Sequence, residues 1–188
     1  MKMKILVIDD FAGNVASAKQ YMPGHEVVVA ESVRVAYRIL KNGELFDAVL
    51  TDLFLPIGDF IGQMNSGYIK PGDRAKEIPA GLIFAIKAAS KGIRAVICSD
   101  SDHHRDWICT LLDLVSANEQ INPVFFEEEG ISRKIVFVEA RFACLRAYWD
   151  EAQEVLVPCN DFLKDGRWIK DWLKVMEQST LFYKEGFC

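Results

Sequence analysis

The chain has 188 residues and a formal net charge of −5, with 51% hydrophobic and 26% charged residues. This composition supports one packed core and argues against intrinsic disorder. It also argues against a nucleic-acid partner, because no basic run is longer than a pair. The length fits a single domain, residues 1–188, better than two.

The five cysteines are an odd set without a C-x-x-C pair, which indicates reduced thiols rather than a disulfide framework or a zinc site. No apolar stretch approaches the ~20 residues that span a bilayer, and the apolar run near the N-terminus is too short for a signal peptide. We therefore expect a cytoplasmic protein without a membrane partner.

The first part of the chain predicts strands alternating with helices. Apolar β-branched runs are typical of buried parallel strands, and Asn14 and Ser32 are suitable helix caps. In chain order, the predicted elements are a strand at 4–8, a helix from Asn14 to 21, a strand at 26–30, a helix at 33–41 and a strand at 48–51.

The rest of the chain continues this rhythm after a long interruption. Residues 57–80 are rich in glycine and predict a loop insertion. The later elements are a helix at 81–90, a strand at 93–98, a helix at 104–115, a strand at 134–138 and a helix at 168–178. A short strand at 124–126 precedes an acidic turn, residues 141–154 fit a helix or a loop, and 155–157 is a short apolar run. The pattern predicts an α/β fold with a doubly wound parallel five-stranded sheet and an enlarged C-terminal region, 117–188.

Three aspartates follow two of the predicted strands: Asp9 and Asp10 after the first, and Asp52 after the third. If these strands are neighbours, the carboxylates converge at the edge of the sheet where ligands bind in such folds. Like charges in one pocket favour a cation such as Mg²⁺, and a carboxylate beside it can attack a phosphoryl group. Alternatively, the aspartates are ordinary turn residues at strand ends.

The segments 5–10, 47–56 and 95–99 resemble the response-regulator receiver family. The resemblance implies a flavodoxin-like receiver fold in which Asp9, Asp10 and Asp52 bind Mg²⁺ and Asp52 accepts a phosphoryl group. It implies that Ser99 hydrogen-bonds the phosphoryl group. It also implies a sensor histidine kinase or phosphotransfer protein as donor, and a downstream protein partner.

Two departures from the family pattern stand out. The family has a lysine at the end of the fifth strand, where this chain has Glu139-Ala140-Arg141. Arg141 and Lys164 are the candidate substitutes, of which Lys164 stands in a local sequence that imitates the family's.

The second departure is a cluster of metal-ligand types, Asp102, His103 and His104, after the fourth strand. His and Asp can ligate a transition metal or act as a base. The other interpretation is that Asp102 caps the following helix and both histidines face solvent.

Three functions follow from these patterns. The first is a stand-alone receiver in a two-component phosphorelay, a phospho-acceptor rather than a turnover enzyme. The second is a pseudo-receiver, which binds partners without phosphorylation. The third is a metal-dependent phosphohydrolase using the aspartates and the Asp102–His104 cluster.

Overall fold

The structure is a computed structural model that describes residues 2–56, 77–99, 121–128, 131–159 and 168–184. Its centre is a six-stranded sheet in the order β2-β1-β3-β6-β8-β7. The first five strands in this order are mutually parallel, and β7 pairs antiparallel with β8 at the edge. The fold is mixed α/β with a parallel five-stranded core, and this order is compatible with a flavodoxin-like fold.

The parallel strands lie close to the apolar runs that predicted them. They are β1 (Lys4–Ile8), β2 (Glu26–Ala30), β3 (Ala48–Thr51), β6 (Arg94–Ser99) and β8 (Ile131–Glu139). Almost every residue of β1, β3 and β6 is buried, because helices cover both faces of the sheet. The edge strand β7 (Ile121–Glu128) is longer than the predicted strand at 124–126.

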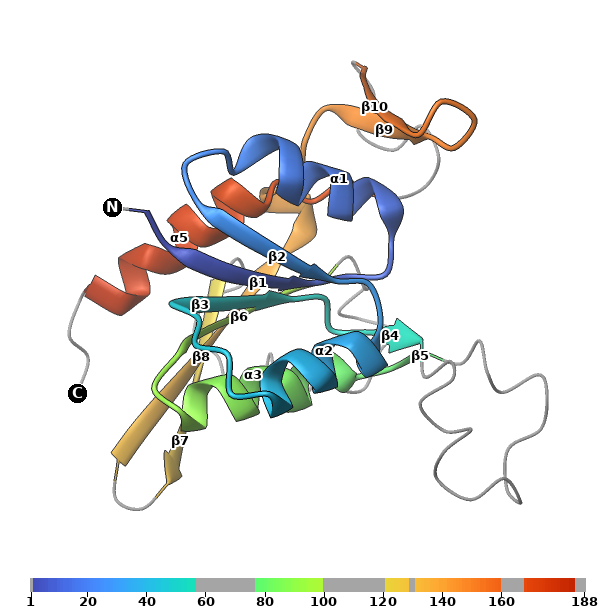
Figure 1. Cartoon of the computed structure of the whole chain (residues 1–188). Coiled ribbons are helices and arrows are strands. Elements are labelled where there is room, and N and C mark those ends of the chain that lie inside the picture. The colour runs from blue at the N-terminus through green and yellow to red at the C-terminus, as the bar shows by residue number, and fades with distance from the viewer. Residues whose placement is uncertain (1, 57–76, 100–120, 129–130, 160–167, 185–188) are drawn as a thin grey trace.

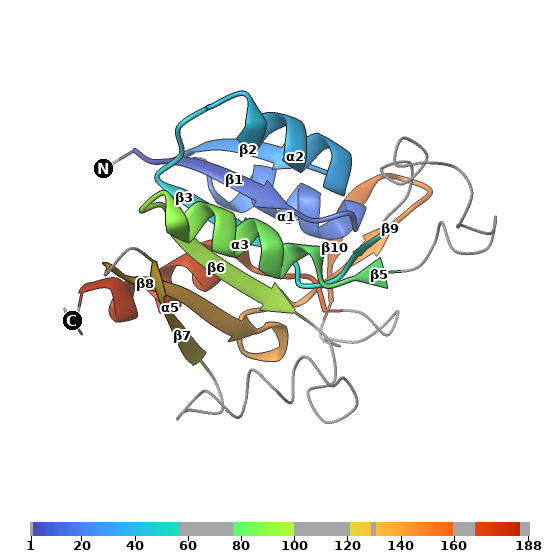
Figure 2. The ribbon, with the colours of Figure 1, turned by 90° about the horizontal axis from the view of Figure 1, so that it is seen from below.

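Two apolar cores lie on opposite faces of the sheet. The helices α1 (Ala12–Tyr21) and α5 (Trp172–Lys184) cover one face, while α2 (Val33–Lys41) and α3 (Ala80–Ser90) cover the other (Figure 1). The view from below shows α2 and α3 side by side on the near face (Figure 2). No helix in the described part of the chain is long and apolar enough to cross a membrane.

The predicted N-cap of α2 is confirmed, whereas the predicted N-cap of α1 is wrong. Ser32 precedes α2 and its hydroxyl accepts a hydrogen bond from Val35 N at 3.3 Å. Asn14, by contrast, lies inside α1, which begins at Ala12 after Phe11. The Asn14 side chain is buried and bonded to the acidic site instead of to the helix end.

Small strands frame the insertion and the C-terminal region. β4 (Leu55–Pro56) pairs antiparallel with β5 (Glu77–Ile78), which joins the two ends of the insertion. Residues 141–154, predicted as helix or loop, contain the end of a 3₁₀ turn (Ala140–Phe142) and strand β9 (Ala147–Asp150). The apolar run near 155 is β10 (Val155–Pro158), which pairs antiparallel with β9. The two segments form a hairpin, so the helix alternative for 141–154 is wrong.

Candidate functional site

The three aspartates lie together at the carboxyl edge of the sheet. β1 and β3 are paired in parallel with Ile8 opposite Thr51, so the residues that follow them are neighbours. One carboxylate oxygen from each of Asp9, Asp10 and Asp52 lies within 4.8 Å of the others. Asp9 is buried, Asp52 partly buried and Asp10 exposed. The predicted convergence is confirmed, and this set of ligands could hold a metal ion.

The Asp9 carboxylate is bound by three donor groups. Its Oδ1 accepts from Phe11 N at 3.0 Å and from Asn14 Nδ2 at 3.2 Å. Its Oδ2 accepts from Asn14 Nδ2 at 3.0 Å and from Lys170 Nζ at 2.9 Å. A carboxylate offers about four lone-pair sites. All four are therefore used, which holds Asp9 in one orientation and compensates its burial.

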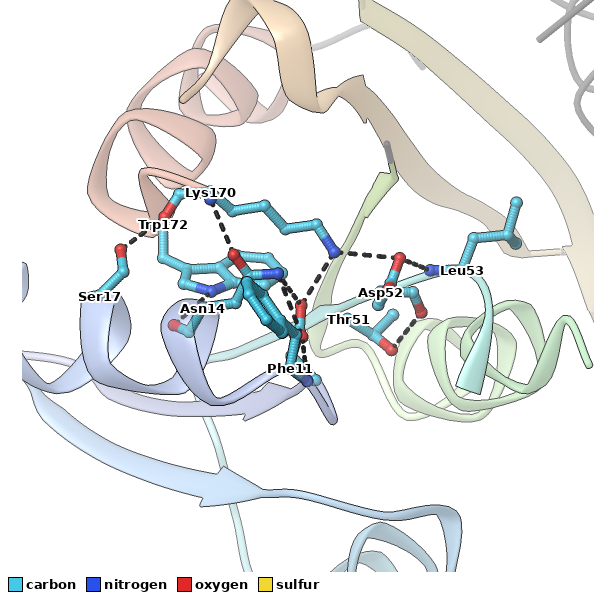
Figure 3. A network of polar contacts seen from close by, with 9 residues as sticks. Phe11, Asn14, Ser17, Thr51, Asp52, Leu53, Lys170 and Trp172 are labelled. Carbon is cyan, nitrogen blue, oxygen red and sulfur yellow. Dashed lines mark hydrogen bonds and ion pairs between the residues drawn. The ribbon is translucent and has the colours of Figure 1, made fainter. Parts of the chain in front are cut away.

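Lys170 is the cation of the site. Its side chain is buried, and its Nζ lies 2.9 Å from Asp9 Oδ2 and 3.0 Å from Asp52 Oδ1. Figure 3 shows the Lys170 side chain extended toward the Asp52 carboxylate. The Lys170 ammonium also lies 5.4 Å from the centroid of the Trp172 ring, a cation–π contact. One ammonium thus joins the aspartates of two strands.

The main chain of Lys170 is also held in place. Its N–H donates to Asn14 Oδ1 at 2.9 Å, and its carbonyl accepts from the Ser17 hydroxyl. Trp172 Nε1 donates to the carbonyl of Asn14 at 3.2 Å (Figure 3). Asn14 therefore binds Asp9 with one end of its amide and Lys170 with the other, which couples α1 to the segment before α5.

That segment is extended rather than helical. Lys170 forms an isolated antiparallel bridge with Cys144. On either side of the bridge, Leu145 N donates to Ile169 O at 2.8 Å and Asp171 N to Ala143 O at 2.8 Å. The chain just after β8 therefore fixes Lys170 by backbone hydrogen bonds.

Asp52 is fixed from three directions. Its Oδ1 accepts from Leu53 N at 2.7 Å as well as from Lys170, and its carbonyl accepts from Thr51 Oγ1 at 2.8 Å. The first turn of α3 lies directly against it: a Cβ placed on Gly81 would be 1.7 Å from the Asp52 carbonyl oxygen. Only glycine permits this approach of helix and strand end.

Ser99 ends β6 on the same side of the sheet. β6 is the neighbour of β3, with Ile97 opposite Thr51, so Ser99 lies two residues further toward the acidic edge. Its side chain is buried. The predicted placement at this edge is confirmed, whereas its role toward a phosphoryl group stays a prediction.

Five further residues were predicted as candidates for the site. Lys164, Asp102, His103 and His104 lie outside the described residues. Arg141 lies in the short turn Ala140–Phe142 directly after β8. The lysine found at the site, Lys170, was missed because residues 168–178 were predicted as one helix.

Two signals in the sequence could have located Lys170. Asp171 is a suitable cap directly before Trp172, and its Oδ1 accepts from Lys174 N at 3.1 Å. A helix that begins there leaves Lys170 in the connection. Ile169 and Trp172 are both buried on either side of Lys170, and a lysine in such apolar surroundings needs a carboxylate partner.

Comparisons of the chain with protein-family models, with curated proteins and with solved structures gave no significant match. The resemblance to receivers therefore depends on the motifs of the chain itself.

The chemistry open to this site follows from its charges. Among the described residues, three carboxylates lie beside one ammonium, and a divalent cation would balance the excess negative charge of this set. Asp52 combines partial exposure with a fixed orientation, and a carboxylate is one of the side chains that serve as nucleophiles. The site could thus hold a cation beside one partly exposed carboxylate.

Proposed function

We propose that the chain is a receiver-type signalling protein that accepts a phosphoryl group on Asp52. The observation that carries this proposal is the position of Lys170, whose ammonium joins Asp9 and Asp52. The sequence lacks the family's lysine at the end of the fifth strand, and Lys170 offers the same charge from a segment bridged to the chain after β8.

The proposed reaction is a simple displacement. One Asp52 carboxylate oxygen attacks the phosphorus of a phosphohistidine donor, a phosphorus–oxygen bond forms, and the phosphorus–nitrogen bond breaks with its electron pair left on the imidazole. Lys170 lies 3.0 Å from Asp52 Oδ1, close enough to pair with the transferred oxygens. A sensor histidine kinase or phosphotransfer protein would supply the group, and a protein partner would bind the product.

The residues of the site fit Mg²⁺ as the proposed cofactor. Asp10 and Asp52 are the more accessible carboxylates, since the lone pairs of Asp9 already accept four contacts. Oxygen ligands from one or two carboxylates, with water, suit Mg²⁺. When bound, Mg²⁺ would neutralise charge on the phosphoryl oxygens.

A second candidate function has its own support. The Asp9–Lys170–Asp52 contacts form a compact ion-pair network, and such networks also serve a structural role. Under this alternative the protein is a pseudo-receiver, which binds partners without phosphorylation. Of the two candidates, we favour the phospho-acceptor because Asp52 remains partly exposed.

The test is incubation with acetyl phosphate and Mg²⁺, followed by intact mass measurement. We expect a phosphoryl adduct that hydroxylamine removes, absent in Asp52→Asn and retained in Asp47→Asn, whose carboxylate is exposed at the opposite end of β3. No adduct despite measurable Mg²⁺ binding would favour the pseudo-receiver. Steady phosphate release without an adduct would favour a phosphohydrolase.

A further inference from the structure

The helices α2 and α3 carry positive charge, although the protein as a whole is acidic. Residues 32–43 and 79–93 carry five of the 22 Lys and Arg residues and none of the 27 Asp and Glu residues. The two helices lie side by side on one face of the sheet, as Figures 1 and 2 both show. A chain with a net charge of −5 thus concentrates positive charge on this side.

The same two helices expose apolar side chains. Within the described residues, six large hydrophobic side chains are exposed, and four of them lie on α2 and α3. These four are Val35 (39% exposed), Tyr37 (45%), Ile83 (63%) and Ile86 (43%). Apolar groups gathered on one surface mark contact sites, whereas isolated ones do not.

Apolar and cationic residues follow one another in the same order on both helices. The exposed pairs, three or four residues apart, are Val35 with Arg38, Tyr37 with Lys41, and Ile83 with Lys87. Residues at this spacing are neighbours on a helix surface, and Lys41 Nζ lies 5.6 Å from the Tyr37 ring centroid. We call these six residues and Ile86 the α2–α3 face.

The order of the pairs produces two bands. Both helices follow parallel strands and return along the sheet, so their N-terminal ends lie at the same edge. The apolar member of each pair is nearer that edge, and the cation lies about one turn further. An apolar band therefore runs across both helices beside a cationic band.

Across the described ranges of the chain, the cations of this face have no acidic partner. Among the residues that the structure describes, Arg38, Lys41 and Lys87 form no ion pair. Lys19 on α1, by contrast, pairs with Glu31. The positive charge of the α2–α3 face is thus available to a ligand of opposite charge.

We propose that the α2–α3 face binds an acidic amphipathic helix of a partner protein. Such a helix presents an apolar stripe beside an acidic stripe, which matches the two adjacent bands in both chemistry and arrangement. An anionic membrane fits less well, because it needs apolar residues at the deepest point with cations around them. This inference does not depend on phosphoryl acceptance by Asp52.

The probe is a synthetic helix-forming peptide of about five turns, with leucine along one stripe and glutamate along the next, labelled for fluorescence anisotropy. Two variants change the face: Lys41→Glu with Lys87→Glu, and Ile83→Ser with Ile86→Ser. Two matched controls lie elsewhere: Lys19→Glu, and Val155→Ser, whose side chain is 42% exposed on β10.

We expect the peptide to bind the full chain, and both face variants to bind at least about tenfold more weakly. The control variants should bind the peptide within about twofold of the unaltered chain. A second peptide, with glutamine in place of glutamate, should bind the unaltered chain as weakly as the original peptide binds the Lys41→Glu, Lys87→Glu variant. The proposal is overturned if the peptide does not bind, or if controls and face variants weaken binding alike. It is also overturned if the face mediates binding to phosphatidylglycerol vesicles or self-association instead.

Discussion

Lys170 determines the electrostatic balance of the acidic site. It is buried against Asp9 and Asp52, so replacing it with methionine leaves Asp9 buried without its cation. Breaking a buried ion pair from one side costs about 3–5 kcal/mol, and we expect Lys170→Met to lower the free energy of unfolding by this amount. Urea unfolding followed by tryptophan fluorescence measures the change, because Trp172 lies beside Lys170.

A matched substitution separates this effect from the general loss of a lysine. Lys19 is exposed and its ammonium lies 3.7 Å from Glu31, so Lys19→Met should change the free energy of unfolding by at most about 0.5 kcal/mol. Combining Lys170→Met with Asp9→Asn should cost less than the sum of the two single changes. Additive costs would show that Lys170 and Asp9 do not interact.

Asn14 couples the aspartate and the lysine. Its amide donates to both Asp9 oxygens and accepts from the main-chain N–H of Lys170. Asn14→Ala removes these hydrogen bonds from the buried Asp9 carboxylate and the Lys170 N–H. We expect the free energy of unfolding to fall by about 1–3 kcal/mol. Gln20→Ala in the same helix is the control, because Gln20 is exposed and its change tests helix propensity alone. Equal effects of both substitutions would contradict a coupling role for Asn14.

The reactivity of the Cys144 thiol measures how well the segment bridged to Lys170 is buried. Burial raises the pKa of the Cys144 thiol, and the charge of Lys174 opposes this only in part. A raised pKa keeps the thiol protonated to higher pH, so alkylation by iodoacetamide should begin at higher pH in the folded than in the urea-unfolded chain. Peptide mapping across a pH series measures this. An identical pH profile in both states would contradict the burial of this thiol.

At the scale of elements, the contact of α3 with β3 depends on Gly81. A Cβ at this position would meet the Asp52 carbonyl oxygen at 1.7 Å, and the backbone must shift to relieve the overlap. We expect Gly81→Ala to lower the free energy of unfolding by about 2–3 kcal/mol and to reduce labelling of Asp52 by acetyl phosphate. Gly24→Ala is the control, because a Cβ added there would have no heavy atom within 4 Å beyond its chain neighbours. Similar results for both glycines would show that helix approach does not constrain the site.

The central strands were predictable because each is a continuous apolar run. β1 and β3 begin and end as predicted, since strands buried on both faces are apolar almost throughout. The edge strand β2 also has its predicted bounds. The start of α5 was not predicted, because Trp168 and Trp172 share a helical spacing. The Asp171 cap and the backbone bridge to Cys144 instead keep residues 168–171 extended, and the helix begins at Trp172.

At the scale of the whole molecule, the acidic half of the site was predictable and the basic half was not. Asp9, Asp10 and Asp52 each follow a predicted strand, and they converge because β1 and β3 are neighbours in the sheet. Lys170 is 161 residues from Asp9 in sequence, and its position depends on how the chain after β8 pairs with the chain before α5. The Asp171 cap could have placed Lys170 before the helix, but no local pattern encodes the pairing that brings its ammonium to the aspartates.

The excess negative charge of the assembled site predicts that Mg²⁺ stabilises the whole molecule. Asp9, Asp10 and Asp52 converge only in the folded chain, so the ion should bind the folded state in preference to the unfolded state. At about ten times its dissociation constant, an ion bound in this way contributes about 1.4 kcal/mol. For a chain of this length, the melting temperature should then rise by about 3–6 °C.

A thermal melt with increasing MgCl₂ measures this rise, and Asp10→Asn should abolish most of it because it removes an exposed ligand without disturbing the Asp9–Lys170 pair. Glu31→Gln should retain the rise, since Glu31 is an exposed carboxylate paired with Lys19 outside the site. Matching NaCl additions correct for ionic strength. An equal rise in Asp10→Asn would mean that Mg²⁺ acts elsewhere on the surface, and that the three aspartates and Lys170 form a structural network rather than a metal site.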